Sequence, residues 1–179
     1  MKDKTFVDTN VFVYSLDAAH PSKRTIADEW IRALWRQRSG RTSTQVLNEL
    51  YVTLTRKLKV RVDDDEAWDA VSALFAWEPL PSDRAVLARA REIQRRYGTS
   101  WWDSLIVAAA QMQDCAVLLS EDLQAGMNFG GVTVQNPFDL RVQELNVVYP
   151  AEPLAPRHRP RGRPRKTSAS IRRPAPISK

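Results

Sequence analysis

Four acidic residues occupy places where an α/β sequence can bring side chains together. Asp8 and Asp122 each follow a short apolar run that predicts a β-strand, whereas Glu49 and Asp103 stand near the starts of helical patterns. In a parallel sheet with right-handed crossovers, the carboxyl ends of the strands share one edge, and ligands bind where the strand order switches. We therefore expect these four carboxylates to meet at that edge.

A cluster of carboxylates calls for a cation. Two carboxylates about 4 Å apart repel each other by roughly 4 kcal/mol at an effective dielectric of about 20, so they need a bound cation or shared protons. The chain has only two histidines and one cysteine, which argues against a zinc cluster and against a Ser-His-Asp triad. Oxygen ligands alone favour Mg²⁺ or Mn²⁺.

Each acidic residue also has a purely structural interpretation. Asp8 could cap a short helix, and Asp103 could be the acid of a capping box that begins at Ser100. Asp122 could be a turn residue, and Glu49 lies off the apolar arc of its helix, where an ordinary solvated glutamate is expected. It is their joint occurrence at one predicted edge that favours a metal site.

Short β-type runs alternate with longer helical patterns, which is typical of a parallel sheet covered by helices. The spacing predicts strands at 6–8, 41–44, 116–119 and 132–134. It predicts helices at 21–37, 45–58, 63–76 and 82–97, a further helix opening at 100–103, and an extended link at 77–80. The expected fold class is α/β, a three-layer α/β/α arrangement with a central, mostly parallel sheet.

Charge is distributed unevenly along the 179 residues, whose net charge is +6. Residues 151–179 contain nine Lys or Arg against one acid, a net charge of +8, and residues 1–150 contain eighteen against twenty, which leaves −2. Prolines and arginines crowd the end of the chain and large apolar side chains are scarce there. We therefore predict a folded domain at 1–149 and a disordered basic tail at 150–179.

Cysteine use and hydropathy indicate the compartment. The lone Cys115 lies in an apolar run and has no partner for a disulfide, which is typical of a reducing compartment. No apolar stretch reaches membrane-spanning length, and the opening Met-Lys-Asp-Lys lacks the apolar segment of a signal peptide. We expect a soluble, cytoplasmic protein with no membrane partner.

Residues 4–140 resemble the PIN-domain nucleases, and among them the VapC-type ribonuclease toxins of bacterial type II toxin–antitoxin pairs. The motifs that carry the resemblance are Phe6-Val7-Asp8-Thr9-Asn10-Val11, Asn48-Glu49, Trp102-Asp103-Ser104-Leu105-Ile106, Leu119-Ser120-Glu121-Asp122-Leu123 and Val134-Gln135-Asn136-Pro137-Phe138. Both their order and their spacing fit that family.

This resemblance implies roles for particular residues. The acidic quartet of the family, with its catalytic and metal-binding roles, falls on Asp8, Glu49, Asp103 and Asp122. The implied polar supports are Thr9, Asn10 and Ser120. Glu121 is an alternative ligand of lower rank. Similar proteins cut RNA with Mg²⁺ or Mn²⁺, so the resemblance implies metal-assisted hydrolysis of RNA, a small antitoxin partner and homodimerisation.

The tail suggests a different class of function. Arg161-Gly162-Arg163-Pro164 resembles the AT-hook, which lays an Arg-Gly-Arg core into the narrow minor groove of A·T-rich DNA. The alternative is a solvated basic extension. An AT-hook would make the chain a DNA- or RNA-binding protein in which the PIN-like part is a platform, although four intact acids argue against a non-catalytic platform.

Two further alternatives concern the folded part. A haloacid-dehalogenase-like phosphatase would use Asp8 as a nucleophile, but that family needs a second Asp where Asn10 stands. Trp30, Trp35 and Tyr51 could form an apolar groove for a partner helix, although aromatic residues at helical spacing are more often part of the core.

Overall fold

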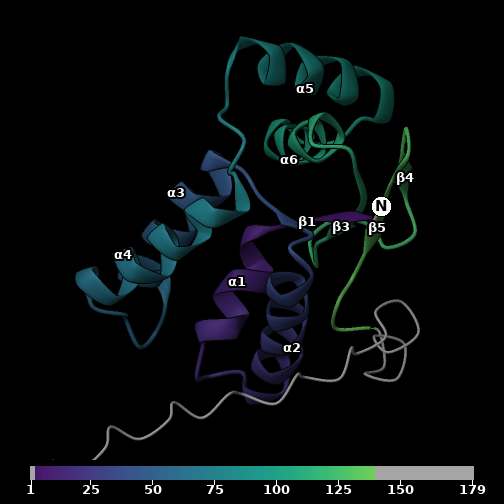
Figure 1. The fold of residues 1–179 in the computed structure, drawn as a ribbon. Helices are drawn as coiled ribbons and strands as arrows, with labels where there is room; N and C mark the ends of the chain where they lie inside the picture. The colour runs from purple at the N-terminus through teal and green to yellow at the C-terminus, as the bar shows by residue number, and fades with distance from the viewer. Residues whose placement is uncertain (1–2, 140–179) are drawn as a thin grey trace, which may run out of the picture.

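The computed structural model describes residues 3–139, in which a five-stranded sheet lies between layers of helices (Figure 1). The strands are β1 (Lys4–Val7), β2 (Gly40–Arg41), β3 (Cys115–Leu119), β4 (Asn128–Phe129) and β5 (Val132–Gln135). Their order in the sheet is β2-β1-β3-β5-β4, and only the β4–β5 pair is antiparallel. The predicted α/β class with a mostly parallel sheet is confirmed.

Helices cover the sheet on both sides. They are α1 (Thr9–Leu16), α2 (Pro21–Gln37), α3 (Thr44–Val52), α4 (Asp64–Ala73), α5 (Arg84–Tyr97) and α6 (Trp101–Met112). A π-helix, η1 (Thr53–Lys57), continues α3, and a 3₁₀-helix, η2 (Leu74–Trp77), continues α4. Helices α1 and α2 lie on one side of the sheet and α5 and α6 on the other, while α3 and α4 extend outward (Figure 1).

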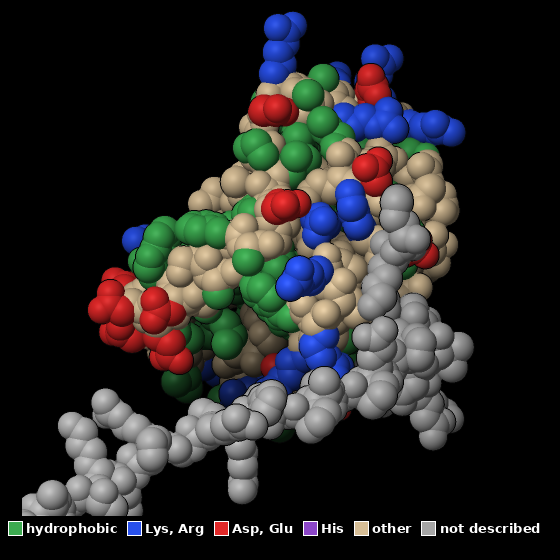
Figure 2. Space-filling view, in the orientation of Figure 1, with side chains coloured by type: hydrophobic (Ala, Val, Ile, Leu, Met, Phe, Trp, Pro, Cys, Tyr) green, Lys and Arg blue, Asp and Glu red, His purple; other side chains and the backbone are tan. Residues whose placement is uncertain are grey.

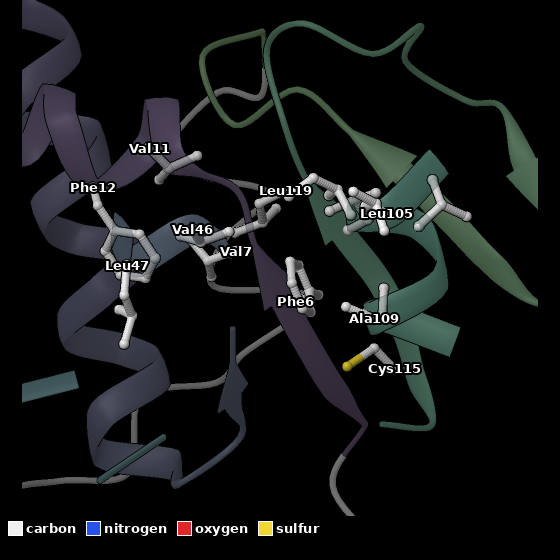
Figure 3. Packing of buried hydrophobic residues seen from close by; sticks show 14 of the residues in the cluster. Phe6, Val7, Val11, Phe12, Val46, Leu47, Leu105, Ala109, Cys115 and Leu119 are labelled. Carbon is white, nitrogen blue, oxygen red and sulfur yellow. The ribbon is translucent and has the colours of Figure 1, made fainter. Parts of the chain in front are cut away.

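Strand β1 is the centre of the core because both of its faces are covered. Its side chains alternate, so that Val7 faces one helical layer and Phe6 faces the other, and both are fully buried (Figure 3). The residues around them in Figure 3 are Val11 and Phe12 of α1, Val46 and Leu47 of α3, and Leu105 and Ala109 of α6. Burying each large apolar side chain contributes about 1.5–3 kcal/mol, which fixes the strand whose end carries Asp8.

Local capping signals placed most helix ends correctly. Ser43 caps α3 by accepting from the backbone N–H of Val46, and Asp83 caps α5. Helix α5 ends at Gly98 in the left-handed conformation (φ 70°), where a glycine avoids the steric cost of a Cβ. The predicted helix at 21–37 has the observed bounds of α2.

Four elements differ from the predictions. The sequence indicates α1 only through one alternative for Asp8, the cap of a short helix, and it does not predict the two-residue strand β4. The helix predicted at 45–58 changes to a π-helix at Thr53, where Leu58 N donates to the Thr53 carbonyl five residues earlier (3.2 Å). The Leu54 carbonyl, which an α-helix would pair with Leu58 N, accepts from Val62 N instead (3.1 Å). The link predicted at 77–80 begins as helix η2.

The early aromatic residues belong mainly to the core. Trp30 is buried, and Trp35 packs its ring against Trp77 with 5.4 Å between the ring centroids. Tyr51 is half-buried and packs against the same cluster. The interpretation as core residues is therefore favoured over a groove for a partner helix.

Charged side chains are segregated on the surface of the described residues. Acidic side chains gather at the outer end of α4, where Asp63 caps the helix and three more acids occupy its first turn (Figure 2). Arginines line the exposed side of α5, at the top of the same view.

Within residues 3–139, no helix combines the length and the apolar character needed to cross a membrane. The predicted tail at 150–179, with its AT-hook-like segment at 161–164, lies outside the described residues.

A close contact fixes edge strand β2 against the helices. A Cβ added to Gly40 would lie 2.6 Å from ring atoms of Trp77, which is closer than van der Waals contact allows. Trp77 is buried and its ring also contacts Phe12 (5.6 Å between centroids). Glycine is therefore required at this position by the approach of the indole.

We predict that Gly40→Ala lowers the free energy of unfolding by about 1–3 kcal/mol, because the added methyl group overpacks a filled site. Urea denaturation followed by far-UV circular dichroism measures the loss. In a Trp77→Leu background the same substitution should cost much less, since the ring that it meets is gone. An equal cost in both backgrounds would show that the Trp77 contact is not the cause.

Candidate functional site

Asp8 stands directly after β1 and is held on both sides. Its carboxylate accepts hydrogen bonds from Thr9 N at Oδ1 (2.7 Å) and from the Ser120 hydroxyl at Oδ2 (2.7 Å). It has an extended backbone and is the N-cap of α1, so the structural interpretation of this residue is correct. Asp8 N also donates to the Leu119 carbonyl (3.0 Å), which aligns the ends of β1 and β3.

The turn after β3 brings Asp122 to the same place. Ser120 is fully buried, and its hydroxyl oxygen accepts from Asp122 N (3.2 Å) while it donates to Asp8. The amide Nδ2 of Asn10 lies 3.2 Å from Asp122 Oδ2 and 3.3 Å from Asp8 Oδ2, and it donates to both. One amide group therefore bridges the two carboxylates that end neighbouring strands, as their predicted positions require.

Glu49 joins this group from α3. The Thr9 hydroxyl donates to Glu49 Oε2 (2.9 Å), and Gln45, one helical turn earlier, donates from its amide to Oε1 (3.0 Å). Glu49 is half-buried rather than freely solvated. Thr9 thus connects Glu49 to the chain segment that carries Asp8, and the predicted polar supports Thr9, Asn10 and Ser120 all contact predicted acids.

Asp103 lies in the first turn of α6 and is joined to its own helix. Asp103 N donates to the Ser100 hydroxyl oxygen (3.1 Å), as the predicted capping box requires, but Asp103 Oδ2 accepts from that hydroxyl (2.7 Å) instead of from the Ser100 backbone N–H. No hydrogen bond to another described residue links it to the other three acids. Within residues 3–139, no set of three or more His, Cys, Asp or Glu side chains is close enough to hold a metal ion.

The electrostatics of Asp8 reflect its crowded position. Burial raises the pKa of its carboxyl group to about 6 from the ordinary 3.8, and the negative charges of Asp122 and Glu49 add to the increase. Hydrogen bonds from Ser120 and Thr9 oppose the increase without cancelling it. The ionised carboxylate is therefore held where it is short of positive charge, which a cation would supply.

Glu121 is engaged elsewhere. Its carboxylate forms an ion pair with Lys23 of α2, and Lys23 also donates to the hydroxyl of Tyr14 (3.1 Å) and lies 4.3 Å from the centroid of that ring. Burial alone would lower the pKa of Lys23, but the hydrogen bonds to Glu121 and Tyr14 raise it overall. These contacts support the lower rank of Glu121.

Sequence reasoning missed two residues of this region. No motif marks Lys23, whereas the spacing of four residues between Gln45 and Glu49 could have revealed Gln45.

A cavity of about 1080 Å³ opens beside the acidic residues. Glu49 and Asp122 line it together with Thr9 and Asn10. The apolar side chains on its walls include Val13, Tyr14, Val52, Leu58, Leu87 and Leu105. This volume slightly exceeds the range of about 300–1,000 Å³ that is usual for ligand pockets, so the cavity admits far more than a metal ion.

The sequence model of the PIN domain matches residues 5–125, which include all four predicted acids. This match spans more than half of the chain, and the protein belongs to the PIN-domain family. PIN domains are typically nucleases that use divalent metal ions. A search among curated proteins found no match for the chain.

The raised pKa of Asp8 gives a prediction for stability. Because the folded-state pKa of about 6 lies above the ordinary 3.8, the folded protein keeps this proton longer, and stability falls as pH rises through that interval. The difference corresponds to about 3 kcal/mol at neutral pH. We predict that Asp8→Asn raises the free energy of unfolding of the metal-free protein by up to about 3 kcal/mol at neutral pH, and by little below about pH 4.

Urea denaturation in EDTA at the two pH values measures this difference. Asp83→Asn is the matched control, since Asp83 also caps a helix but its cap bonds lie at the protein surface, away from the other predicted acids. Added Mg²⁺ should stabilise the native sequence and not the Asp8→Asn protein, because binding to the folded state alone shifts the equilibrium. If Asp8→Asn is no more stable than the native sequence at neutral pH, the ionised Asp8 carboxylate does not destabilise the folded protein.

Proposed function

We propose that this PIN-domain protein is an endoribonuclease that hydrolyses the phosphodiester bonds of RNA with Mg²⁺ or Mn²⁺ as cofactor. One observation carries the proposal: Asp8, Glu49 and Asp122 come from three separate elements and are connected by hydrogen-bonding side chains beside a large cavity. Membership of a family of nucleases supports the same conclusion.

The chemistry of the donors fits a hard divalent cation, while the described side chains would have to move closer together for three of them to bind one ion. The donors are carboxylate oxygens, and the raised pKa of Asp8 marks a place that lacks positive charge. Asp8 and Asp122 would hold the ion, with Glu49 and Asp103 completing the proposed set of ligands. When bound, the cation supplies Lewis acidity, which makes a water molecule a better nucleophile and offsets the negative charge that grows on the phosphate.

The protein's own side chains contribute position and orientation. Asn10 and Ser120 keep the carboxylates of Asp8 and Asp122 together despite their repulsion. Thr9 and Gln45 occupy both oxygens of Glu49 and so fix its orientation. Hydrogen bonds of this kind to metal ligands orient them and tune their affinity for the ion. The carboxylates position the reaction and need not act as nucleophiles.

The phosphatase alternative is weaker on the same geometry. A haloacid-dehalogenase-like enzyme needs a second acid at position 10, and here the Asn10 amide bridges Asp8 and Asp122. An Asp8 oxygen that accepts from both Ser120 and Asn10 is also poorly prepared to attack phosphorus. A covalent aspartyl-phosphate at Asp8 would revive this alternative.

We further propose that the ribonuclease is the toxin of a toxin–antitoxin pair. The VapC-type motifs across residues 4–140 support this role, which implies a small antitoxin partner and a homodimer. A gene for a short DNA-binding protein immediately upstream would support it, and its absence would favour a solitary nuclease. Binding of A·T-rich DNA through Arg161, Gly162, Arg163 and Pro164 is a separate proposal that rests on the sequence of the tail alone.

The central test is RNA cleavage by purified variants. We predict that Asp8→Asn or Asp103→Asn lowers the cleavage rate by roughly 100-fold or more while the fold survives, because each removes charge from the proposed cation site. EDTA should abolish cleavage by the native sequence, and Mg²⁺ or Mn²⁺ should restore it. Sequencing the 5′ ends produced from total RNA, with and without Mg²⁺, measures both the rate and the cleavage site. Undiminished cleavage by either variant would contradict the proposal.

A second test separates the two neighbouring acids after β3. We predict that Asp122→Asn removes most of the activity, whereas Glu121→Gln keeps activity within about threefold of the native level, because the carboxylate of Glu121 is already paired with Lys23. The Mg²⁺ concentration for half-maximal activity should rise only for Asp122→Asn. The reverse pattern would assign the ligand role to Glu121.

A further inference from the structure

Two adjacent tryptophans at the start of α6 have opposite environments. Trp101 is half-buried and packs against the core, whereas 63% of Trp102 is exposed. Within the described part of the chain, no other aromatic ring packs on Trp102, whereas the somewhat less exposed Trp68 (53%) packs edge-to-face on Phe75 (6.0 Å between centroids). Both Trp101 and Trp102 line the cavity that Glu49 and Asp122 also line. The exposed indole face of Trp102 is thus open to a ligand.

We propose that Trp102 is a stacking platform for an unpaired nucleobase of the RNA substrate, close to the phosphodiester that is cut. This inference rests on the proposed ribonuclease function and specifies its substrate as single-stranded RNA. Trp102 lines the same cavity as Glu49 and Asp122, so a base on the indole lies in the cavity that two of the proposed ligands share. Large exposed aromatic side chains bind unpaired bases by stacking, whereas the base faces of a duplex are already covered.

The walls of the cavity suit a base better than a peptide helix. Neutral side chains that can hydrogen-bond to base edges and 2′-hydroxyl groups line it at Gln45, Asn48, Thr53 and Ser82. Asn48 is exposed, and its amide makes no hydrogen bond to any described residue, so its donors and acceptor are available. An amphipathic helix needs a continuous apolar groove, which Asp17, Glu49 and Asp122 interrupt here.

A positive charge stands on the same wall. The π-helix η1 carries Lys57 and Thr53 to the cavity, and Lys57 is exposed. The irregular turn is a feature often found at functional sites. Lys57 is placed to contact the phosphate backbone of a strand whose base lies on Trp102. The acids, the indole and this cation together give one cavity the groups that a short single strand requires.

The binding test uses the full chain with Asp8→Asn, so that RNA is bound but not cut. The probes are ten-nucleotide single-stranded RNAs, each with 2-aminopurine at one position, titrated in the presence of Mg²⁺. We expect quenching of 2-aminopurine at one or two positions, lost in Trp102→Ala. The dissociation constant should rise about 5- to 100-fold in Trp102→Ala and less than about threefold in Trp102→Phe. Trp68→Ala is the matched control and should bind within about twofold.

A second arm replaces the quenched nucleotide with an abasic one. The abasic RNA should bind more weakly than the intact RNA to the protein that keeps Trp102. For Trp102→Ala the two RNAs should bind almost equally, because the substitution and the abasic site remove the same contact. In the cleaving protein, Trp102→Ala should raise KM more than it lowers kcat, as expected when binding energy is lost in the ground state as well. A duplex of the same sequence should compete poorly.

Several outcomes would overturn the stacking role. One is that Trp102→Ala binds RNA as tightly as Trp68→Ala does, and another is that duplex and single strand bind with equal affinity. The others are that the cavity binds a protein partner in place of RNA, and that the protein binds no RNA at all. The two proposals fail differently. If the native sequence cuts no RNA but binding still depends on Trp102, the nuclease proposal fails alone. If it cuts RNA and Trp102→Ala behaves like the Trp68→Ala control, the stacking proposal fails alone.

Discussion

Mutual repulsion of carboxylates at the ends of β1 and β3 is the constraint on which this site depends. The parallel ladder places Asp8 and Asp122 at one edge, and the fold must keep them there without a positive side chain between them. It does so with neutral donors: the Asn10 amide bridges both groups, and the buried Ser120 hydroxyl ties Asp8 to the turn that carries Asp122. Neutral donors hold the oxygens in place and leave their charge available to a cation.

The one cation of α2 that reaches this edge is placed so that it does not interfere. Lys23 forms an ion pair with Glu121 and lies over the Tyr14 ring, so its charge neutralises the acid that the proposed site does not use. Had Lys23 reached Asp8 instead, the pKa of that carboxyl group would be lowered and a divalent cation would meet a site already neutralised. The position of one positive charge therefore distinguishes Glu121, which is ion-paired, from the proposed metal ligands, which form no ion pair with a described residue.

Sequence patterns predicted what is determined locally. Ser43, Asp83 and Gly98 mark helix ends because caps depend only on neighbouring residues, and the apolar runs before Asp8 and Asp122 indicated strands that share an edge. Helix α1 was harder to predict because its Val, Phe and Tyr residues favour strands, and only packing against α2 and α3 decides for a helix. The π-helix and the Lys23–Glu121 pair depend on contacts between distant segments, which spacing along the chain does not encode.

The structural and the chemical interpretations of the acids prove to be compatible. Asp8 caps α1, and Asp103 accepts from the hydroxyl of Ser100, the N-cap of α6, so each carboxyl group is held on one side by a neighbouring donor. A cap fixes the side-chain torsions of a carboxylate and leaves lone pairs free, because an ionised carboxylate can accept about four hydrogen bonds. Helix capping can therefore hold a carboxylate in a fixed orientation before a metal ion binds. A residue that caps a helix can also serve as a metal ligand.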